Sequence, residues 1–271
     1  MIKDNLFSKI IRNCYYYLRK IILIIPNLIY SNKKHKYVFI LSPPFSGSTL
    51  LNQILSSSKN VSCNNNIGTR EGQTLPIVKE IIFDSNRWEK NKKLPWDKIK
   101  KIWRSYWYLK KPILLDKSTT NIMRINDLIN TFELTYFICL IRNPYAICEG
   151  IMRRSGKSAA DAAKFTVDCL NYQMQNIQKN ENILFFSYED LCDNTDNIIN
   201  KIKNYLIELN DIDANQKFKA HNYKTKKSMY ITNLNNEKIK KIQQKDLLTI
   251  NNYFREHKDL LDFFNYKLIS Y

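Results

Sequence analysis

The chain has 271 residues, of which 44% are hydrophobic and 13% aromatic, so it can bury one large core. Its 43 lysines and arginines against 25 acidic residues give a net charge of +18, which indicates an anionic partner. The six cysteines lack metal-ligand spacing, which argues against a zinc module, and five glycines with seven prolines leave no stretch typical of an interdomain linker.

Residues 1–36 form a basic and apolar N-terminal segment. Basic residues such as Arg12 and Arg19 flank apolar and aromatic ones, and the apolar run 21–30 is interrupted by Pro26. A membrane-spanning helix needs about 20 apolar residues, so no such helix is predicted. A signal peptide is not predicted either, because the segment lacks a small-residue cleavage site. Two interpretations stay open: an amphipathic helix on an anionic membrane, and a helix packed against the rest of the chain.

Residues 37–41 are consecutive apolar residues and predict a buried parallel strand. Pro43 and Pro44 end it, and apolar residues recur at helical spacing from Leu50 onward. The turn between strand and helix therefore lies at a helix N-terminus, where unpaired N–H groups and the helix dipole can hold a phosphate or sulfate. The turn residues expected at this anion are Phe45, Ser46, Gly47, Ser48 and Thr49.

This turn differs from the phosphate loop of nucleoside-triphosphate enzymes. It has one glycine and no lysine, so the main electrostatic contact with the β- and γ-phosphates is missing. It resembles instead the 5′-phosphosulfate loop of the sulfotransferase family, which uses 3′-phosphoadenosine 5′-phosphosulfate as donor. A helix cap on an ordinary strand-helix unit is the alternative.

The resemblance implies a His or Glu base shortly after the loop helix. The three histidines, His35, His221 and His257, lie elsewhere, whereas Glu71 lies in this segment between two glycines. We therefore expect Glu71 to accept the proton of the acceptor hydroxyl. The alternative is a plain surface ion pair between Glu71 and Arg70.

Residues 114–121 begin apolar, end polar and predict another strand end that faces the cleft. Lys117 would point at the donor, and in the tyrosylprotein sulfotransferase branch a lysine at a similar position stabilises charge on the transferred group. Phe45 stands where the family's loop usually has Lys or Arg. Either Lys117 provides the stabilisation alone, or the site is weakened or inactive. The alternative is that Lys117 is an ordinary surface lysine without a role in the site.

Residues 134–141 predict a further strand that ends at Arg142, with Asn143 and Pro144 suited to begin a helix. This resembles the family's 3′-phosphate motif. Arg142 matches its first arginine, and Arg154 matches the second as found in the tyrosylprotein branch. The family's serine is replaced by Gly150, which removes a hydroxyl contact, although an arginine fork makes the stronger charge-assisted bonds. The alternative is that Arg142 is a capping charge at the helix start and Arg154 a solvated surface charge.

Residues 183–191 give a strand followed by Tyr-Glu-Asp-Leu, a run that many sulfotransferases share at this place. The resemblance places Tyr188 near the nucleotide, while Glu189 and Asp190 favour the start of the next helix. Farther on, a basic segment of residues 221–228 stands where relatives fold a loop over the donor. Its lysines are candidates for the 3′-phosphate, or part of a solvated charged run.

The alternation of strands and helices predicts a P-loop-like three-layer α/β/α fold with a central parallel sheet, formed as a single domain by residues 37–271. The motif order resembles the tyrosylprotein/carbohydrate sulfotransferase-like branch, which implies metal-free in-line sulfuryl transfer to a hydroxyl of a glycan, lipid, tyrosine or small molecule. The alternatives are a weakened nucleotide-binding relative and a basic membrane or nucleic-acid module.

The nucleic-acid alternative depends on lysines interleaved with tryptophans between Trp88 and Trp107, which could stack on bases. No motif of a known nucleic-acid module occurs, so no specific nucleic acid is expected. Reduced thiols indicate a cytoplasmic location. The alternative is a cytoplasmic protein attached peripherally to a membrane through residues 1–36.

Overall fold

A parallel sheet forms the centre of the chain in the computed structural model, which describes residues 6–180, 182–219 and 228–270. Its spatial strand order is β2-β3-β1-β4-β5, and every neighbouring pair is parallel. The strands are β1 (Lys36–Leu41), β2 (Val61–Cys63), β3 (Ile113–Asp116), β4 (Thr135–Ile141) and β5 (Ile183–Ser187). The prediction of a central parallel sheet is confirmed.

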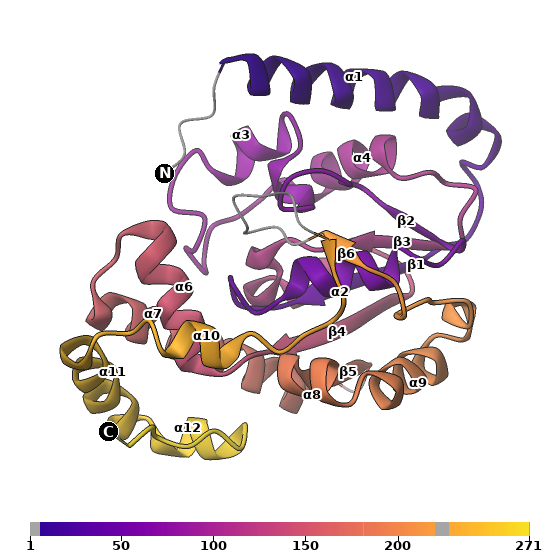
Figure 1. Cartoon of the computed structure of the whole chain (residues 1–271). Helices are drawn as coiled ribbons and strands as arrows, with labels where there is room; N and C mark the ends of the chain where they lie inside the picture. Colours follow the sequence, from indigo (N-terminus) through magenta and orange to yellow (C-terminus); the bar gives the residue numbers. More distant parts are fainter. Residues whose placement is uncertain (1–5, 181, 220–227, 271) are drawn as a thin grey trace.

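Helices cover both faces of this sheet (Figure 1). The α-helices are α1 (Leu6–Ile29), α2 (Ser48–Leu55), α3 (Val78–Ile82), α4 (Trp96–Tyr106), α5 (Ile125–Thr131), α6 (Pro144–Ser155), α7 (Ala159–Lys179), α8 (Tyr188–Asp193), α9 (Thr195–Tyr205), α10 (Asn235–Ile239), α11 (Gln244–Glu256) and α12 (Lys258–Phe263). Short 3-10 helices are η1 (Gly72–Thr74), η2 (Thr119–Met123) and η3 (Ile207–Leu209), and β6 (Phe218–Lys219) pairs antiparallel with β7 (Ser228–Met229).

The central strand β1 shows why the fold has three layers. Side chains alternate between the faces of a strand, so Val38 and Ile40 pack with α2, α8 and α9 on one face. Phe39 and Leu41 pack with α3, α4 and α5 on the other. Because both faces are covered, the strand is apolar throughout, as its sequence predicts.

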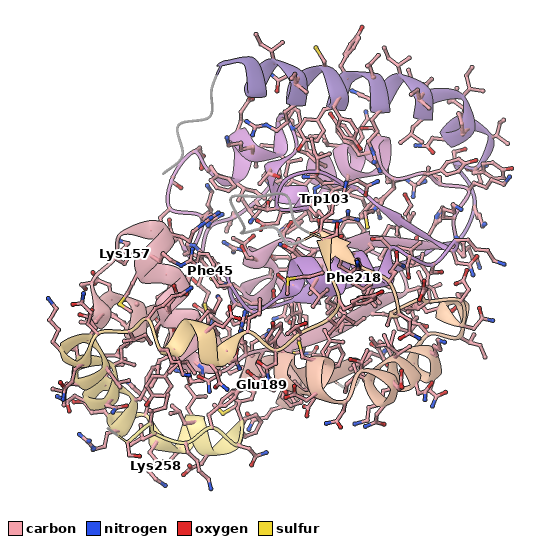
Figure 2. All side chains as sticks on the ribbon, viewed as in Figure 1. Phe45, Trp103, Lys157, Glu189, Phe218 and Lys258 are labelled. Carbon is pink, nitrogen blue, oxygen red and sulfur yellow. The ribbon has the colours of Figure 1, made fainter. Side chains whose placement is uncertain are left out.

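The tryptophans of the lysine-rich segment are part of the core. Trp103, which is labelled in Figure 2, and Trp107 have no exposed surface. Trp103 stacks on Phe132 with ring centroids 6.0 Å apart. Trp88 is half-buried and meets Phe165 edge-on at 4.7 Å. These rings stabilise the layer between α4 and the sheet, so Trp103 and Trp107 cannot stack on nucleic-acid bases.

Helix α1 lies across one side of the molecule, next to α4 (Figure 1). Arg19 donates hydrogen bonds to the Tyr106 carbonyl at 2.9 and 3.1 Å, and Asn27 donates to the Trp107 carbonyl at 2.8 Å. The helix is thus fixed to the body by polar side chains, as one interpretation of the segment expects. Within the described residues, no helix combines the length and apolarity that crossing a bilayer requires.

Candidate functional site

A cavity of ≈ 1950 Å³ opens where the carboxyl ends of β1, β3, β4 and β5 meet. Because β1 lies between β3 and β4, the turn after β1 has Lys117 on one side and Arg142 on the other. The predicted site residues on the cavity wall are Phe45, Gly47, Ser48, Thr49, Glu71, Lys117, Arg142, Arg154 and Tyr188. Ser46 is the exception, since it is fully buried and does not line the cavity.

The turn places the open N-terminus of α2 in the cavity. Gly47 is the N-cap with φ 88°, and the first intrahelical bonds run from Leu50 and Leu51 N–H to its carbonyl. No side chain caps this end, so the N–H groups of Ser48 and Thr49, two residues that line the cavity, have no intrahelical acceptor. A Cβ on Gly47 would lie 2.5 Å from Tyr188 Cδ2, so both the backbone angle and the neighbouring ring demand glycine.

Arg142 is 4% exposed and joins the turn to two other segments. Its Nη1 donates to the Phe45 carbonyl at 3.2 Å, its Nε donates to Asn235 Oδ1 at 2.7 Å, and its Cζ lies 3.8 Å above the Tyr188 ring. Its Nη2 is buried without a hydrogen-bond partner among the described residues. An unpaired buried guanidinium nitrogen is costly, and an anion bound in the cavity would satisfy it.

Phe45 of the turn and Gly150 of α6 contact each other. Phe45 takes φ 67°, which is uncommon for a residue with a side chain, and its ring lies beside α6 (Figure 2). A Cβ on Gly150 would lie 2.6 Å from Phe45 Cγ and 2.8 Å from its Cβ. The Phe45 ring therefore needs the space that glycine leaves at position 150, so the residues at these two positions depend on each other.

Gly150→Ser is accordingly expected to lower stability by about 1–3 kcal/mol, because the new side chain overpacks the Phe45 ring. Phe45→Ala combined with Gly150→Ser should recover most of that loss, measured as the midpoint of denaturant unfolding. If the stability change of the double variant equals the sum of the changes in the two single variants, the two residues are not coupled.

The second predicted arginine lies at the rim. Arg154 is exposed, and its guanidinium has no hydrogen bond or ion pair among the described residues, while the neighbouring Arg153 donates to the buried Glu149 at 2.5 Å. Lys238 of α10 lines the same wall, 3.8 Å from Glu149. Burial, with Arg142 nearby, lowers the pKa of Lys238 to about 7. Sequence reasoning missed Lys238, because it is one lysine in a lysine-rich stretch.

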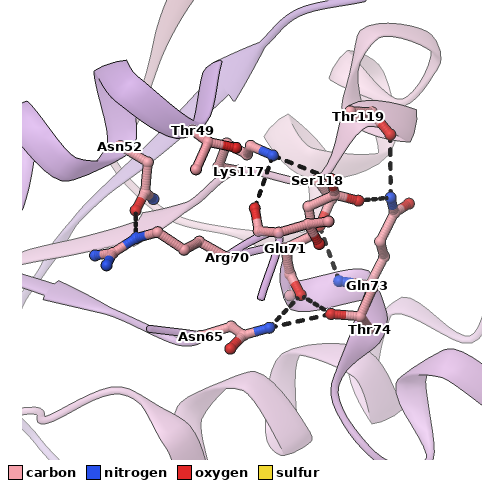
Figure 3. A network of polar contacts seen from close by, with 12 residues as sticks. Thr49, Asn52, Asn65, Arg70, Glu71, Gln73, Thr74, Lys117, Ser118 and Thr119 are labelled. Atoms are coloured by element: carbon pink, nitrogen blue, oxygen red, sulfur yellow. Dashed lines mark hydrogen bonds and ion pairs between the residues drawn. The ribbon is translucent and has the colours of Figure 1, made fainter. Parts of the chain in front are cut away.

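The predicted base and the predicted cation form a buried ion pair (Figure 3). Lys117 Nζ donates to Glu71 Oε1 at 3.0 Å and to the Thr69 carbonyl at 2.9 Å, and both side chains are at most 10% exposed. Glu71 Oε2 accepts a hydrogen bond from Gln73. The alternative pair with Arg70 is wrong, since Arg70 turns to α2 and bonds Asn52 instead.

A buried carboxylate that sequence reasoning passed over holds the loop of Glu71 in place. Asp116, at the end of β3, accepts hydrogen bonds from Asn64, Asn121 and the N–H groups of Gly72 and Ser118, at 2.8 to 3.0 Å. Burial raises the pKa of Asp116. A Cβ on Gly72 would lie 2.2 Å from Asp116 Oδ1, so this glycine allows a close backbone approach.

The start of α6 follows the prediction for Asn143 and Pro144. Asn143 Oδ1 accepts from Tyr145 N at 3.0 Å, and Pro144 is the first helical residue. Glu189 opens α8 as expected and also accepts from Asn143 N at 2.9 Å and from the Tyr266 hydroxyl at 3.0 Å. It thereby ties the Arg142 junction to the C-terminal segment.

Two further expectations concern the surroundings of the site. The candidate lysines Lys224, Lys226 and Lys227 lie outside the described residues. Elsewhere in the chain, within those residues, no three His, Cys, Asp or Glu side chains are grouped so that they could hold a metal ion.

The chain is similar to known proteins in sequence family and in fold. The family model described as "Sulfotransferase family" matches residues 38–210. The sulfotransferase domain from the Synechococcus PCC 7002 olefin synthase has a TM-score of 0.56 at 21% identity, covering 88% of this chain and 98% of that one. The sulfotransferase domain from the curacin biosynthetic pathway has 0.52 at 17%, covering 87% and 99%. Sulfotransferase STF9 from Mycobacterium avium has 0.51 at 10%, covering 91% and 81%. No curated protein matches.

Proposed function

The chain belongs to the sulfotransferase family, and from this we propose that it transfers a sulfuryl group from 3′-phosphoadenosine 5′-phosphosulfate to an acceptor hydroxyl by in-line displacement. One observation supports this most: the Arg142 guanidinium lies 3.2 Å from the carbonyl of Phe45, inside the turn at the N-terminus of α2. Two sites suited to anions are therefore adjacent, as a donor with phosphate at both ends of its adenosine requires.

Each end of the donor has residues that suit it. The N–H groups at the start of α2, with the hydroxyls of Ser48 and Thr49, are assigned to the 5′-phosphosulfate. The unpaired Nη2 of Arg142 is assigned to the 3′-phosphate, with Arg154 approaching from the rim. The Tyr188 ring under Arg142 keeps the guanidinium in position.

The buried pair of Glu71 and Lys117 is assigned to the chemical step. The Lys117 ammonium has three N–H donors and uses two of them on Glu71 and Thr69, so the third is available for an oxygen of the transferred group. Glu71 keeps unused lone pairs on both carboxylate oxygens and would accept the acceptor proton. Charge that develops on the donor is stabilised by groups already oriented before the reaction.

Donor binding is expected to weaken as pH rises above about 7 because of Lys238. Its pKa is lowered to about 7 by burial and by the cations Arg142, Arg153 and Lys241, against the opposing effect of Glu149. Below that pH the ammonium is present in the free protein; above it a bound anion must restore the proton. The dissociation constant of 3′-phosphoadenosine 5′-phosphate, measured by calorimetry between about pH 6 and about pH 9, should rise with pH, and Lys238→Met should flatten that rise.

A second candidate function is donor binding without turnover, and the Phe45 ring in the place of a loop cation favours it. Incubation with ³⁵S-labelled donor and glycan, lipid and tyrosine-peptide acceptors separates the two. We expect label on an acceptor together with released 3′-phosphoadenosine 5′-phosphate. Tight nucleotide binding without any transfer would identify the second function, and absence of nucleotide binding would contradict both.

A further inference from the structure

Helix α1 exposes an apolar face to solvent. Of its 24 residues, ten large hydrophobic ones are 45–70% exposed, and those at 70% are Ile22, Ile25, Leu28 and Ile29. The others are Ile10, Ile11, Tyr17, Leu18, Ile21 and Ile24. At 1.5 Å per residue the helix is about 36 Å long, so these side chains form an extended patch of the kind that marks an interaction surface.

The opposite face of α1 packs on the body through the buried side chains of Tyr16 and Leu23 and through polar bonds. Arg19 bonds the carbonyls of Cys63 and Tyr106, and Asn27 bonds Trp107 and the Leu109 N–H. An ordinary surface helix turns its apolar face to the core, whereas α1 buries only a few apolar side chains and leaves ten large ones on the solvent side. The polar bonds hold the apolar face outward, and Figure 2 shows side chains that project from α1 away from the body.

The charge around this face selects the kind of surface it fits. Helix α1 contains no acidic residue, and Lys20, Lys33 and Lys34 are exposed on it or directly after it. On the adjoining α4, Lys98 and Lys101 are exposed as well. An apolar face with a basic border suits an anionic bilayer. Helices of this kind lie in the plane of the headgroups, with the apolar face toward the acyl chains and the basic residues near the anionic headgroups.

The same helix forms a wall of the catalytic cavity. Its cavity-lining residues are Arg12, Asn13, Tyr16, Tyr17 and Lys20. Tyr17 is also 68% exposed, so it belongs to both surfaces. The mouth of the cavity therefore borders the apolar face, and a headgroup in a membrane under α1 lies beside the entrance.

We propose that the outer face of α1 docks the chain on an anionic bilayer and that the acceptor is a hydroxyl on the headgroup of a lipid in that bilayer. The acceptor assignment rests on the proposed sulfuryl transfer: the headgroup oxygen bonds to sulfur, the bond from sulfur to the bridging phosphate oxygen breaks, and the hydroxyl proton goes to Glu71. The docking surface stands independently of that reaction.

Docking is tested by cosedimentation of the full chain with vesicles of phosphatidylcholine mixed with phosphatidic acid, and with phosphatidylcholine vesicles as the neutral comparison. We expect the wild type to bind the anionic vesicles, and added salt to weaken that binding. The triple substitution Ile22→Ser/Ile25→Ser/Ile29→Ser should lower the affinity for these vesicles on the order of tenfold or more. The matched control is Ile207→Ser, since Ile207 is 74% exposed but lies in η3. Failure of the wild type to bind, or equal loss in the control, overturns the docking surface. The docking surface is also overturned if the wild type is a dimer and the triple substitution converts it to a monomer, because the apolar face would then be a dimer interface.

The acceptor is tested with ³⁵S-labelled donor and anionic vesicles made from a glycolipid-containing lipid extract, beside the water-soluble sugars released from the same extract. Label is expected in the organic phase, and reduced about tenfold in the triple variant. Label on soluble sugar alone, or no label in lipid, overturns the lipid acceptor. Nucleotide binding by calorimetry reports separately on the donor site, and the triple variant should leave it unchanged.

Discussion

Lys117→Met is expected to lower the turnover number on the order of 100- to 1000-fold while leaving the dissociation constant of 3′-phosphoadenosine 5′-phosphate nearly unchanged. The ammonium is buried, 3.0 Å from Glu71, and its free N–H is assigned to charge that develops only during transfer. The product nucleotide lacks the sulfuryl group, so it reports donor binding without that contact. Steady-state kinetics and calorimetry on the same preparation give both numbers.

The same substitution leaves the Glu71 carboxylate buried without its cation, which is expected to cost about 3–5 kcal/mol of unfolding free energy. Glu71→Gln in the Lys117→Met background should recover much of that stability but none of the turnover. Lys36→Met serves as control, because the Lys36–Glu208 pair lies at the surface and is worth about 0–1 kcal/mol. Turnover that returns together with stability would show that the pair is structural only.

Arg142→Ala is expected to raise the dissociation constant of 3′-phosphoadenosine 5′-phosphate about tenfold to about a hundredfold, with turnover at saturating donor changed far less. The 3′-phosphate stays bound through the reaction, so Arg142 contacts it equally in the ground and transition states. Arg142→Lys should recover only part of the affinity, because one ammonium replaces a fork that reaches Asn235, Phe45 and the phosphate.

Arg255→Ala is the matched control for charge removal. Arg255 is exposed on α11 and its guanidinium donates a hydrogen bond to Asn252, so its loss tests the general effect of net charge on an anionic ligand. Equal weakening by both alanine substitutions would mean that Arg142 provides no specific phosphate contact.

The parts of the fold that the sequence predicts are those fixed by local pattern. The apolar run of β1, the proline break and the helical spacing after Gly47 lie within a few residues of one another, and each is visible without knowing the fold. The same holds for Asn143 and Pro144 at the start of α6. Parallel topology then brings the carboxyl ends of these strands to one edge, which is why the predicted residues line one cavity.

The parts that the sequence does not reveal depend on contacts between distant segments. Phe45 and Gly150 are far apart in the sequence, and only the structure shows that the ring of one fills the space left by the other. Arg70 is next to Glu71 in sequence, yet Lys117 takes the carboxylate because the end of β3 lies against that loop. Lys238 reaches the Arg142 pocket from the short helix α10 in a lysine-rich stretch of sequence, and Asp116 accepts hydrogen bonds that fix the loop of Glu71.

The most direct test of two adjacent anion sites is a calorimetric cycle with two ligands and two proteins. Wild type and Arg142→Ala are titrated with 3′-phosphoadenosine 5′-phosphate and with adenosine 5′-phosphate, which lacks the 3′-phosphate. We expect the 3′-phosphate to strengthen binding to wild type by at least about tenfold, and this gain to vanish in Arg142→Ala. Equal affinity of wild type for both nucleotides, or a 3′-phosphate gain that survives the substitution, would contradict the account.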